Sequence, residues 1–346
     1  MKNRLFIFAF LSLTVVSCVR FEKYPYKISD FRPELRKHIQ SIIADKEIRY
    51  STTSADYFLR DSCSKDELLK LMRFKNPLVR LRVYDVIVFR SDIDQFPILL
   101  NHLDDTVKVM RWTSDHTADS ITVADAMISA NRRREVLTRP QKNKLIDFIL
   151  TKHLYLNYVK WILVDIEPQE KYYSTIKKLA QKKLNDCSDV NYTLGLAKFK
   201  KQTDIPLIKK NISVFDQNIS CFYNNFNVIE IFPDTAFFPI LTNYFEQIIK
   251  IHKPKYHYYS DDLQYYCRAV VQYRNAKSLA ILIALTKPET YPDSSHLERK
   301  KEYVFEAIHK YKSPIYDSLY NALKPQMDEF FLEHLDEIKY WDRKFW

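Results

Sequence analysis

The sequence predicts an all-α fold, an α-solenoid built from about seven to eight two-helix repeats with capping helices at its ends. Three observations lead to this prediction. Glycine is almost absent from the 346 residues, expected helix starts recur every 31 to 43 residues, and apolar residues within the segments recur at three- and four-residue steps. A two-helix unit of this length cannot bury its own apolar face and therefore stacks on its neighbours.

Gly195 is the only glycine in the chain, where average usage would give roughly 24. Hairpin turns need glycine for positive φ values, so antiparallel barrels and sandwiches are disfavoured. A dinucleotide fingerprint, a phosphate-binding P-loop and a nucleophile elbow each need two or more glycines. The composition excludes these three kinds of site and favours helices joined by short polar turns.

The chain begins with a basic start, Lys2 and Arg4, followed by an apolar run from Leu5 to Val16. This run is too short to cross a bilayer of about 30 Å and predicts a secretory signal. It ends in Val15-Val16-Ser17-Cys18, which resembles the lipobox of bacterial lipoproteins. The resemblance implies that residues 1–17 are removed and that Cys18 is lipidated. The alternative is an ordinary signal peptide with an incidental cysteine.

After Cys18, we expect residues 18–30 to form a lipidated tether and residues 31–346 to form one helical repeat domain. A first helix is predicted from Pro33 to about Ile48, followed by a loop from Ser51 to Ser54. The first helices of the successive repeats are predicted to begin near Asp66, Pro97, Pro140, Tyr173, Pro206, Pro239, Ser278 and Pro314.

The second helix of the first repeat has the phrase Asn76-Pro77-Leu78-Val79-Arg80, continued by apolar residues on one helical face. This phrase resembles the second helix of HEAT repeats. Asp105-Thr106-Val107-Lys108 begins in the same way and predicts the next copy. The resemblance covers roughly residues 60–325. It implies a curved, right-handed stack with a concave binding surface, and it implies no catalytic residues.

The residues from Pro325 onward alternate apolar and acidic side chains and predict an amphipathic helix that caps the stack. The alternative is an exposed segment that docks on a partner or bilayer through Trp341, Phe345 and Trp346.

The longest spacing contains an insertion, residues 112–139, with Asp115, His116, Asp119 and Asp125. Carboxylate and imidazole groups can bind a divalent metal, but no second histidine lies nearby and loop aspartates commonly cap helices. We therefore expect no metal site. The cluster Arg132, Arg133 and Arg134 is a candidate binding site for phosphate or carboxylate groups, with a solvated charge run as the alternative.

A second insertion, residues 251–262, brings tyrosines and cationic side chains together. Tyr256, Tyr258 and Tyr259 are candidate binding residues for sugars, peptides or lipid headgroups, and loop packing is the alternative. His252 and His257 are five residues apart, which does not fit a helical zinc pair. Asp261 and Asp262 would form a site for glycan chemistry only if they met these tyrosines in a deep pocket.

The formal net charge is +11, and its excess is concentrated between Lys171 and Lys210, where ten lysines face three aspartates. Equivalent positions of stacked repeats lie side by side, so this stretch can form a basic face. A secreted lipoprotein rarely meets nucleic acid, so we expect no nucleic-acid partner. Anionic lipid phosphates, acidic glycans or an acidic protein fit the compartment, and a solubilising charged face is the alternative.

Four cysteines remain beyond Cys18. Secretion permits disulfides, but neighbouring helices pack at about 8–10 Å, beyond the reach of roughly 7 Å between the Cα atoms of a disulfide. Cys187 and Cys221 lie nearly one repeat apart, in positions expected to stack. We predict buried thiols at all four positions and no disulfide framework. These are Cys63, Cys187, Cys221 and Cys267.

The sequence resembles HEAT-like lipoproteins of Bacteroidota, in its lipobox, its repeat phrase and segments such as Val123–Ile128 and Leu196–Phe199. We expect a membrane-tethered envelope scaffold or binding protein that holds a protein or an anionic envelope component. No catalysis and no cofactor are expected. The alternative is a helical glycan-binding or glycan-active envelope protein. Cys18 is followed by no acidic run of the kind that resembles a surface-export signal. We therefore expect an outer-membrane anchor that faces the periplasm.

Overall fold

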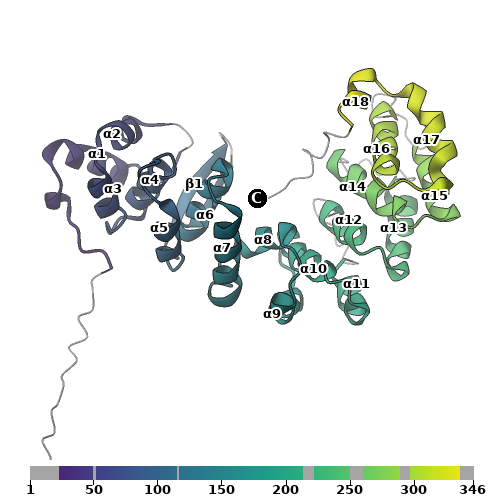
Figure 1. The fold of residues 1–346 in the computed structure, drawn as a ribbon, viewed down its shortest axis with the longest axis horizontal. Coiled ribbons are helices and arrows are strands. Elements are labelled where there is room, and N and C mark those ends of the chain that lie inside the picture. Colours follow the sequence, from purple (N-terminus) through teal and green to yellow (C-terminus); the bar gives the residue numbers. More distant parts are fainter. Residues whose placement is uncertain are drawn as a thin grey trace, which may run out of the picture. The chain divides into compact units, whose positions relative to one another are not determined.

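The structure is a computed structural model. It describes residues 23–49, 52–114, 117–212, 222–249, 260–288 and 297–335 (Figure 1). The chain divides into two compact units, Met1–Ala130 and Asn131–Trp346. Over the described ranges the secondary structure is mostly helical, with a single antiparallel sheet of two strands. The predicted all-α class is therefore correct except for this hairpin.

The first unit begins with a short 3-10 helix and continues through five α-helices and the hairpin. Its elements are η1 (Ile28–Asp30), α1 (Pro33–Ala44), α2 (Ser54–Ser62), α3 (Lys65–Leu71), α4 (Pro77–Ile87), α5 (Gln95–Asn101), β1 (Lys108–Ser114) and β2 (Thr117–Thr122). Helix α6 (Val123–Arg134) begins in this unit and ends in the second.

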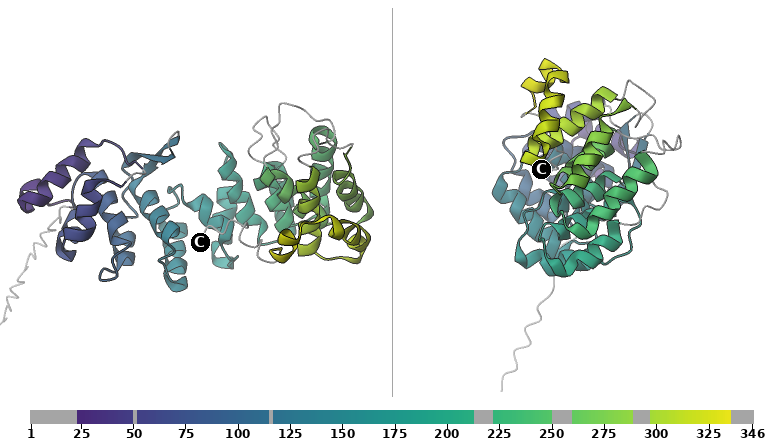
Figure 2. Two further views of the ribbon diagram at one scale, coloured as in Figure 1. Left: turned by 90° about the horizontal axis from the view of Figure 1, so that it is seen from above. Right: turned by 90° about the vertical axis from the view of Figure 1, so that its right-hand side faces the viewer.

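In the described residues of the second unit, the regular secondary structure consists of helices, which turns and loops connect. Its α-helices are α7 (Arg139–Lys152), α8 (Val159–Asp165), α9 (Glu170–Ala180), α10 (Val190–Ala197), α11 (Ile205–Ile212), α12 (Phe222–Ile231), α13 (Phe238–Tyr244), α14 (Ser260–Val271), α15 (Ala276–Leu285), α16 (Leu297–Lys310), α17 (Asp317–Leu323) and α18 (Glu329–Glu333). Its shorter helical turns are η2 (Cys187–Asp189), η3 (Gln202–Asp204), η5 (Thr235–Phe237), η6 (Phe245–Ile249), η9 (Pro314–Tyr316) and η10 (Lys324–Gln326). Figure 2 shows these helices following one another in chain order.

The expected helix starts agree with the structure to within three residues. Helix α3 begins at Lys65, α5 at Gln95, and α11 at Ile205, immediately before Pro206. Prolines in the first turn and side-chain caps set these boundaries. Thr53 and Ser64, for example, each accept the amide hydrogen of the residue three positions later.

The second-unit helices differ in how they are buried. All eight residues of α10 are buried, from Val190 to Ala197. In α9 the buried residues lie on one face, represented by Tyr172, Ile176 and Leu179. A helix that is buried all round lies inside a stack, and a one-sided helix lies at its edge.

Alternate helices of the second unit pack directly on one another. Helix α8 contacts α10, α10 contacts α12, α12 contacts α14, and α14 contacts α16. Helices α9 and α11 also touch. Each of these helices packs on the helix two positions away, an order that resembles the packing in helical-repeat proteins.

Aromatic side chains form much of the core between α12, α13 and α14. The ring of Phe226 lies 4.8 Å from that of Tyr244 and 5.2 Å from that of Tyr266, measured between centroids. The Tyr266 hydroxyl donates a hydrogen bond to the carbonyl oxygen of Leu241 at 3.0 Å. Edge contacts of this kind add to the stability that burial of the rings already gives.

The prediction that a second repeat helix begins at Asp105 is wrong. The residues from Lys108 form strand β1, which pairs with β2, and the next helix, α6, begins only at Val123. Buried Val109 lies next to exposed Met110, an alternation that fits a strand and not a helix. The amide of Ile48 and its carbonyl also bond to β1, at Met110 and Trp112, both at 2.8 Å.

The expected tether differs from the structure from residue 23 onward. Tyr26 forms a parallel bridge with Phe74, and the ring of Tyr26 contacts that of Phe31 at 6.4 Å between centroids. Segment 24–30 therefore packs on the first unit. The segment expected to form a C-terminal cap contains η10 and α18, but neither of these elements has a buried residue. Trp341, Phe345 and Trp346 lie outside the described residues.

Candidate binding surfaces

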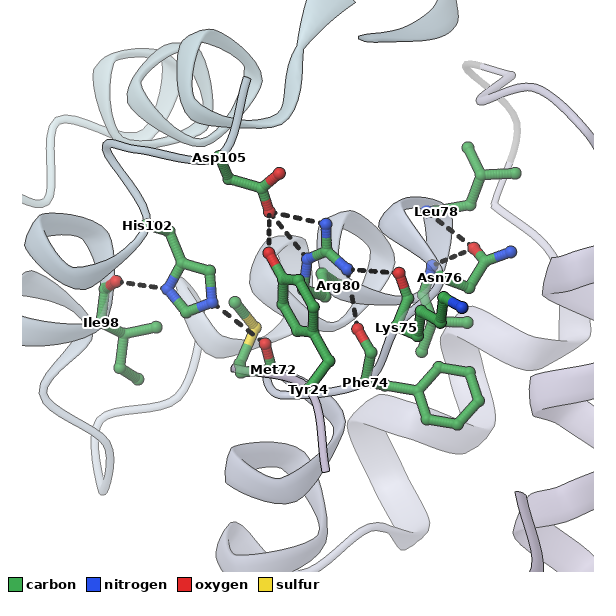
Figure 3. Close-up of polar contacts among 11 residues, drawn as sticks. Tyr24, Met72, Phe74, Lys75, Asn76, Leu78, Arg80, Ile98, His102 and Asp105 are labelled. Atoms are coloured by element: carbon green, nitrogen blue, oxygen red, sulfur yellow. Dashed lines mark hydrogen bonds and ion pairs between the residues drawn. The ribbon is translucent and has the colours of Figure 1, made fainter. Parts of the chain in front are cut away.

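The most buried polar cluster of the first unit is centred on Arg80 of α4 (Figure 3). The Arg80 side chain is fully buried and its Nε and Nη2 atoms lie 2.8 and 2.7 Å from Oδ2 of Asp105. Its Nη1 atom donates to the carbonyl oxygens of Phe74 and Lys75, each at 2.7 Å. The guanidinium group is thus occupied by internal acceptors.

Tyr24 covers this cluster from the N-terminal segment. Its ring centroid lies 4.3 Å from the Arg80 guanidinium carbon, and its hydroxyl donates to Oδ2 of Asp105 at 3.3 Å. Burial raises the pKa of Tyr24, and the nearby Asp105 carboxylate adds to that shift. Nearby, the ring nitrogens of His102 lie 2.8 and 3.0 Å from the carbonyl oxygens of Ile98 and Met72. These contacts connect α4, the ends of α3 and α5, and the N-terminal segment. We interpret the cluster as one that stabilises the fold.

The insertion predicted at residues 112–139 contains the hairpin and α6. Asp119 lies opposite Arg111 in the sheet, and buried Asp125 accepts a hydrogen bond from the Thr122 hydroxyl at 2.7 Å. The Thr122 hydroxyl accepts the amide hydrogen of Asp125 at 3.0 Å and so caps α6, with Asp125 in the first turn. Asp115 and His116 lie outside the described residues. Among the residues that are described, no group of three or more metal-binding side chains is present.

The arginine cluster occupies the last turn of α6. Arg133 and Arg134 are exposed and Arg132 is half-buried. Positive side chains in the last turn of a helix are stabilised by its negative end. The helix end explains why three arginines are favourable at this place, and the cluster stays a candidate binding site for phosphate or carboxylate groups.

The tyrosine cluster of the second insertion lies outside the described residues. Its members are Tyr256, Tyr258 and Tyr259, with His252 and His257 beside them in the sequence. Asp262 is buried, and its Oδ1 atom accepts the amide hydrogen of Tyr223 at 3.0 Å, at the beginning of α12. The Asp262 carboxylate is therefore engaged as a helix cap.

The ten lysines of the lysine-rich stretch divide into four that contact groups inside the fold and six that are exposed. In the first group, lysines form ion pairs within the fold. Lys177 lies 2.7 Å from Asp204, Lys171 lies 2.7 Å from Asp147, and Lys201 lies 2.6 Å from Glu170. These lysines neutralise carboxylates of neighbouring helices.

Lys198 belongs to the same internal group but meets carbonyl oxygens. Its amine donates to the backbone oxygens of Val164 and Ile166, the latter at 3.1 Å, at the end of α8. Burial lowers the pKa of Lys198 to about 8, with Asp165 opposing the shift. A charged donor at this position stabilises the negative end of α8.

The second group of lysines is exposed, in or just after α9, α10 and α11. Its members are Lys178, Lys182, Lys183, Lys200, Lys209 and Lys210. The sequence predicted a basic face from the charge excess. It could not indicate which lysines pair with carboxylates, because the acidic partners shown above belong to other helices.

A shallow groove of about 130 Å³, which the sequence did not indicate, lies between α7 and the loop that precedes α9. Its lining includes Arg139, Asn143, Glu167 and Tyr172. Arg139 and Glu167 pair across it at 3.0 Å, and both side chains are more than three-quarters exposed. The groove is open and its charges are mutually compensated.

The cysteine prediction is correct for two residues and wrong for a third. Cys63 and Cys267 are buried free thiols. Burial raises the pKa of the Cys63 thiol to about 11 and that of Cys267 further, which keeps both thiols protonated and unreactive. Cys187 is disulfide-bonded, to a partner outside the described residues. The expected helix spacing failed here because Cys187 lies in the turn η2, before α10, and not within a packed helix.

Comparison of the chain with known protein families, with characterised proteins and with solved structures finds no match. None of the helices in the described part of the chain is long and apolar enough to cross a membrane. Cys18 lies outside the described residues.

Proposed function

We propose that this protein is a lipid-anchored helical-repeat binding protein of the cell envelope. In this proposal the body is a right-handed α-solenoid of about seven to eight HEAT-like repeats with capping helices. Cys18 anchors it to the outer membrane on the periplasmic side. The body holds a protein or an anionic envelope component and carries out no catalysis.

The observation that carries this proposal is the packing of alternate helices, from α8 through α10, α12 and α14 to α16. In such an array each repeat contacts mainly its neighbours, and the outer helices present similar positions one after another. An extended surface of this kind suits a macromolecular partner better than a small molecule.

The placement of the aromatic residues also supports a scaffold. Phe226, Tyr244 and Tyr266 are buried between helices of the second unit. A glycan site would need aromatic rings exposed beside carboxylates, and the carboxylate of Asp262 is engaged in capping α12.

The contact of Tyr24 with Arg80 limits the distance between the proposed anchor at Cys18 and the first unit. Five residues separate Cys18 from Tyr24, which packs on Arg80. An extended chain of this length spans about 20 Å. The proposed anchor would therefore keep the first unit close to the bilayer surface.

Site-specific photo-crosslinking in envelopes tests the proposal. A photoreactive residue is placed at one exposed position on each of four outer helices, α7, α9, α13 and α15. These positions are Lys144, Ser174, Asn243 and Ala280. We expect one partner to be crosslinked from two or more successive helices. Crosslinks confined to a single position, or none at any, would contradict an extended binding surface.

A further inference from the structure

We propose that the outer edge of strand β2 docks an extended segment of a partner protein, which adds to the hairpin as a third, antiparallel strand. The segment carries apolar and basic residues in alternation. This edge belongs to the first unit, whereas the proposed partner-binding array belongs to the second. The inference depends on neither the lipid anchor nor the array, so its test can fail or succeed independently of them.

The two strands of the hairpin differ in how their edges are used. The amide of Ile48 donates to the carbonyl oxygen of Met110, and the amide of Trp112 donates to the carbonyl oxygen of Ile48, both at 2.8 Å. Strand β1 is therefore paired on both sides, with β2 and with Ile48. In the part of the chain that the structure describes, β2 pairs with β1 alone. Its other edge is open.

The register shows which backbone groups point outward from this edge. In an antiparallel pair, residues that bond to the neighbouring strand alternate with residues whose amide and carbonyl groups point away from it. Met110 and Trp112 bond to Ile48, so their partners in the register, Ser120 and Ala118, point away from β1. Both residues are exposed, and no other described residue bonds to their backbone groups. The edge thus offers amide donors and carbonyl acceptors at the spacing of a strand.

The open edge lacks the features that usually protect one. Natural edge strands are blocked by proline, by lysine or by a bulge. Strand β2 contains no proline and no lysine, and the irregularity of the hairpin lies in β1, between Trp112 and Ser114. Ala118 and Ser120 have small side chains that leave room for a neighbouring backbone. The edge is therefore suited to strand addition, in which main-chain hydrogen bonds supply the affinity.

One face of the hairpin favours apolar side chains on the added strand. Directly opposite residues of an antiparallel pair share a face. Ala118 lies opposite Trp112 and Ser120 opposite Met110, whose side chain is 43% exposed. Residues of an added strand that bond to Ala118 and Ser120 would lie on this same face. Apolar side chains there would cover apolar area beside Met110.

The other face favours a basic residue. Asp119 is the single charged residue of β2. It is exposed, and within the described ranges its carboxylate has no ion-pair partner. The residue of an added strand between the two apolar ones would lie directly opposite Asp119, where an opposite charge is favourable and a like charge is not. The edge therefore selects the order apolar, basic, apolar.

The same carboxylate disfavours a second copy of this chain as the occupant. If two β2 strands paired antiparallel through Ala118 and Ser120, their Asp119 residues would share a face, directly opposite each other or within two residues. Like charges at such positions destabilise the pair. Charge complementarity thus favours a different protein with a basic residue in an extended segment.

Fluorescence anisotropy with labelled peptides tests the proposal, using the full chain carrying Cys18→Ser in about 0.15 M salt. The probes are peptides of about eight residues with blocked ends. One alternates valine with lysine, one alternates valine with glutamate, and one is the lysine peptide with N-methyl groups on its valines. We expect the lysine peptide to bind at least about fivefold more tightly than the glutamate peptide. The N-methylated peptide should bind about tenfold more weakly than the lysine peptide, because it cannot donate to the edge carbonyls.

Two variants connect the binding to this edge. Ser120→Pro removes an outward amide and leaves the bonds to β1 in place, so it should weaken the lysine peptide about tenfold. Its control, Ser120→Ala, keeps the amide and should change binding less than about twofold. Asp119→Lys should reverse the preference, so that the glutamate peptide binds more tightly. This last variant changes an exposed side chain and keeps the test valid if proline disturbs the hairpin.

Three results would overturn the proposal. The first is a lysine peptide that fails to bind, or that binds as well with its valines N-methylated. The second is an unchanged peptide preference in Asp119→Lys. The third is a concentration-dependent dimer of the parent chain that Ser120→Pro abolishes, because the edge would then belong to a second copy.

Discussion

Four residues with positive φ show how this chain folds with almost no glycine. Lys46, Glu135, Lys200 and Arg274 have φ between 48° and 56° and follow the ends of α1, α6, α10 and α14. Glycine usually fills this left-handed position after a helix because a Cβ atom is strained there. The sequence indicated short polar turns but not these four positions, because lysine, arginine and glutamate carry no left-handed signal.

Glycine at these positions should therefore stabilise the protein. We expect Lys200→Gly and Arg274→Gly each to raise the free energy of unfolding by about 0.5–1 kcal/mol, since relief of strain exceeds the entropy cost of glycine. Lys178→Gly, within α9, is the matched control and should lower it by about 0.5–1 kcal/mol. Urea unfolding measures all three, and a lower stability for Lys200→Gly would contradict the strain argument.

The buried pair of Arg80 and Asp105 should matter far more than an exposed pair. Arg80→Met leaves the Asp105 carboxylate buried without its partner and should cost about 3–5 kcal/mol. Arg139→Met breaks an exposed pair with Glu167 and should cost less than about 1 kcal/mol. Comparable losses in thermal or urea unfolding of the two variants would show that the Arg80 cluster is not a structural centre.

Lys198 should make stability depend on pH in the alkaline range. Its pKa is about 8 in the folded protein, against an ordinary value of 10.5 in the unfolded chain. Between these values the unfolded state binds the extra proton, so the free energy of unfolding rises with pH. We expect Lys198 to contribute a gain of about 1–2 kcal/mol between pH 8 and pH 10. Tyrosines such as Tyr266 and Tyr316, whose pKa is raised by burial, act in the opposite direction in the upper part of this range, because they ionise first in the unfolded chain.

The comparison with Lys198→Met isolates this contribution. Because tyrosine ionisation is common to both chains, the stability of the parent relative to the variant should rise by about 1–2 kcal/mol between pH 8 and pH 10. Urea unfolding at a series of pH values gives both profiles. Parallel profiles would mean that Lys198 titrates at its ordinary pKa in the folded state.

At the scale of the elements, the packing of α10 explains why a glycine is needed at position 195. Gly195 is buried in α10, and a Cβ atom there would lie 3.1 Å from Cβ of Leu163 and 3.4 Å from Cγ2 of Ile176. Its role is close packing of α10 against α8 and α9, and its φ is not positive. The prediction that glycine scarcity favours helices holds, but the remaining glycine lies inside a helix and not in a turn.

A larger side chain at this position should separate these helices. Gly195→Val should lower the free energy of unfolding by about 2 kcal/mol or more, because the contacting Leu163 Cβ atom is close to backbone and cannot move far. The double variant Gly195→Val with Leu163→Ala should recover part of the loss. Thermal unfolding followed by circular dichroism tests this, and an unchanged midpoint for Gly195→Val would contradict it.

Helix starts were predictable because they depend on local signals. Prolines such as Pro97 and Pro206 fit the first turn, and caps such as Thr53 satisfy free amides, whatever the tertiary structure. The hairpin could not be predicted from local signals. Asp105 and the residues after it have the sequence pattern of a repeat-helix start, but the Asp105 carboxylate accepts a hydrogen bond from Arg80 instead. Strand β1 is fixed by pairing with β2 and with Ile48, which no local pattern reveals.

At the scale of the whole molecule, the proposed role depends on the lysine-rich stretch from Lys171 to Lys210 and on the proposed lipid anchor at Cys18. The sequence showed how many lysines the basic stretch holds, whereas the structure shows that Lys171, Lys177 and Lys201 pair with carboxylates of neighbouring helices. Tyr24 packs on Arg80, and only five residues of the sequence separate it from the proposed anchor at Cys18. This short spacing fits a protein held close to a membrane.

The central claim, a helical-repeat body anchored through Cys18, is tested most directly by intact-mass spectrometry of the protein purified from membranes. We predict a mature chain that begins at Cys18 and carries a thioether-linked diacylglyceryl group. Cys63→Ser should retain this mass increment, and Cys18→Ser should lose it and leave the membrane fraction. A mature chain that begins at another residue, or an unmodified Cys18 in membrane-bound protein, would contradict the account.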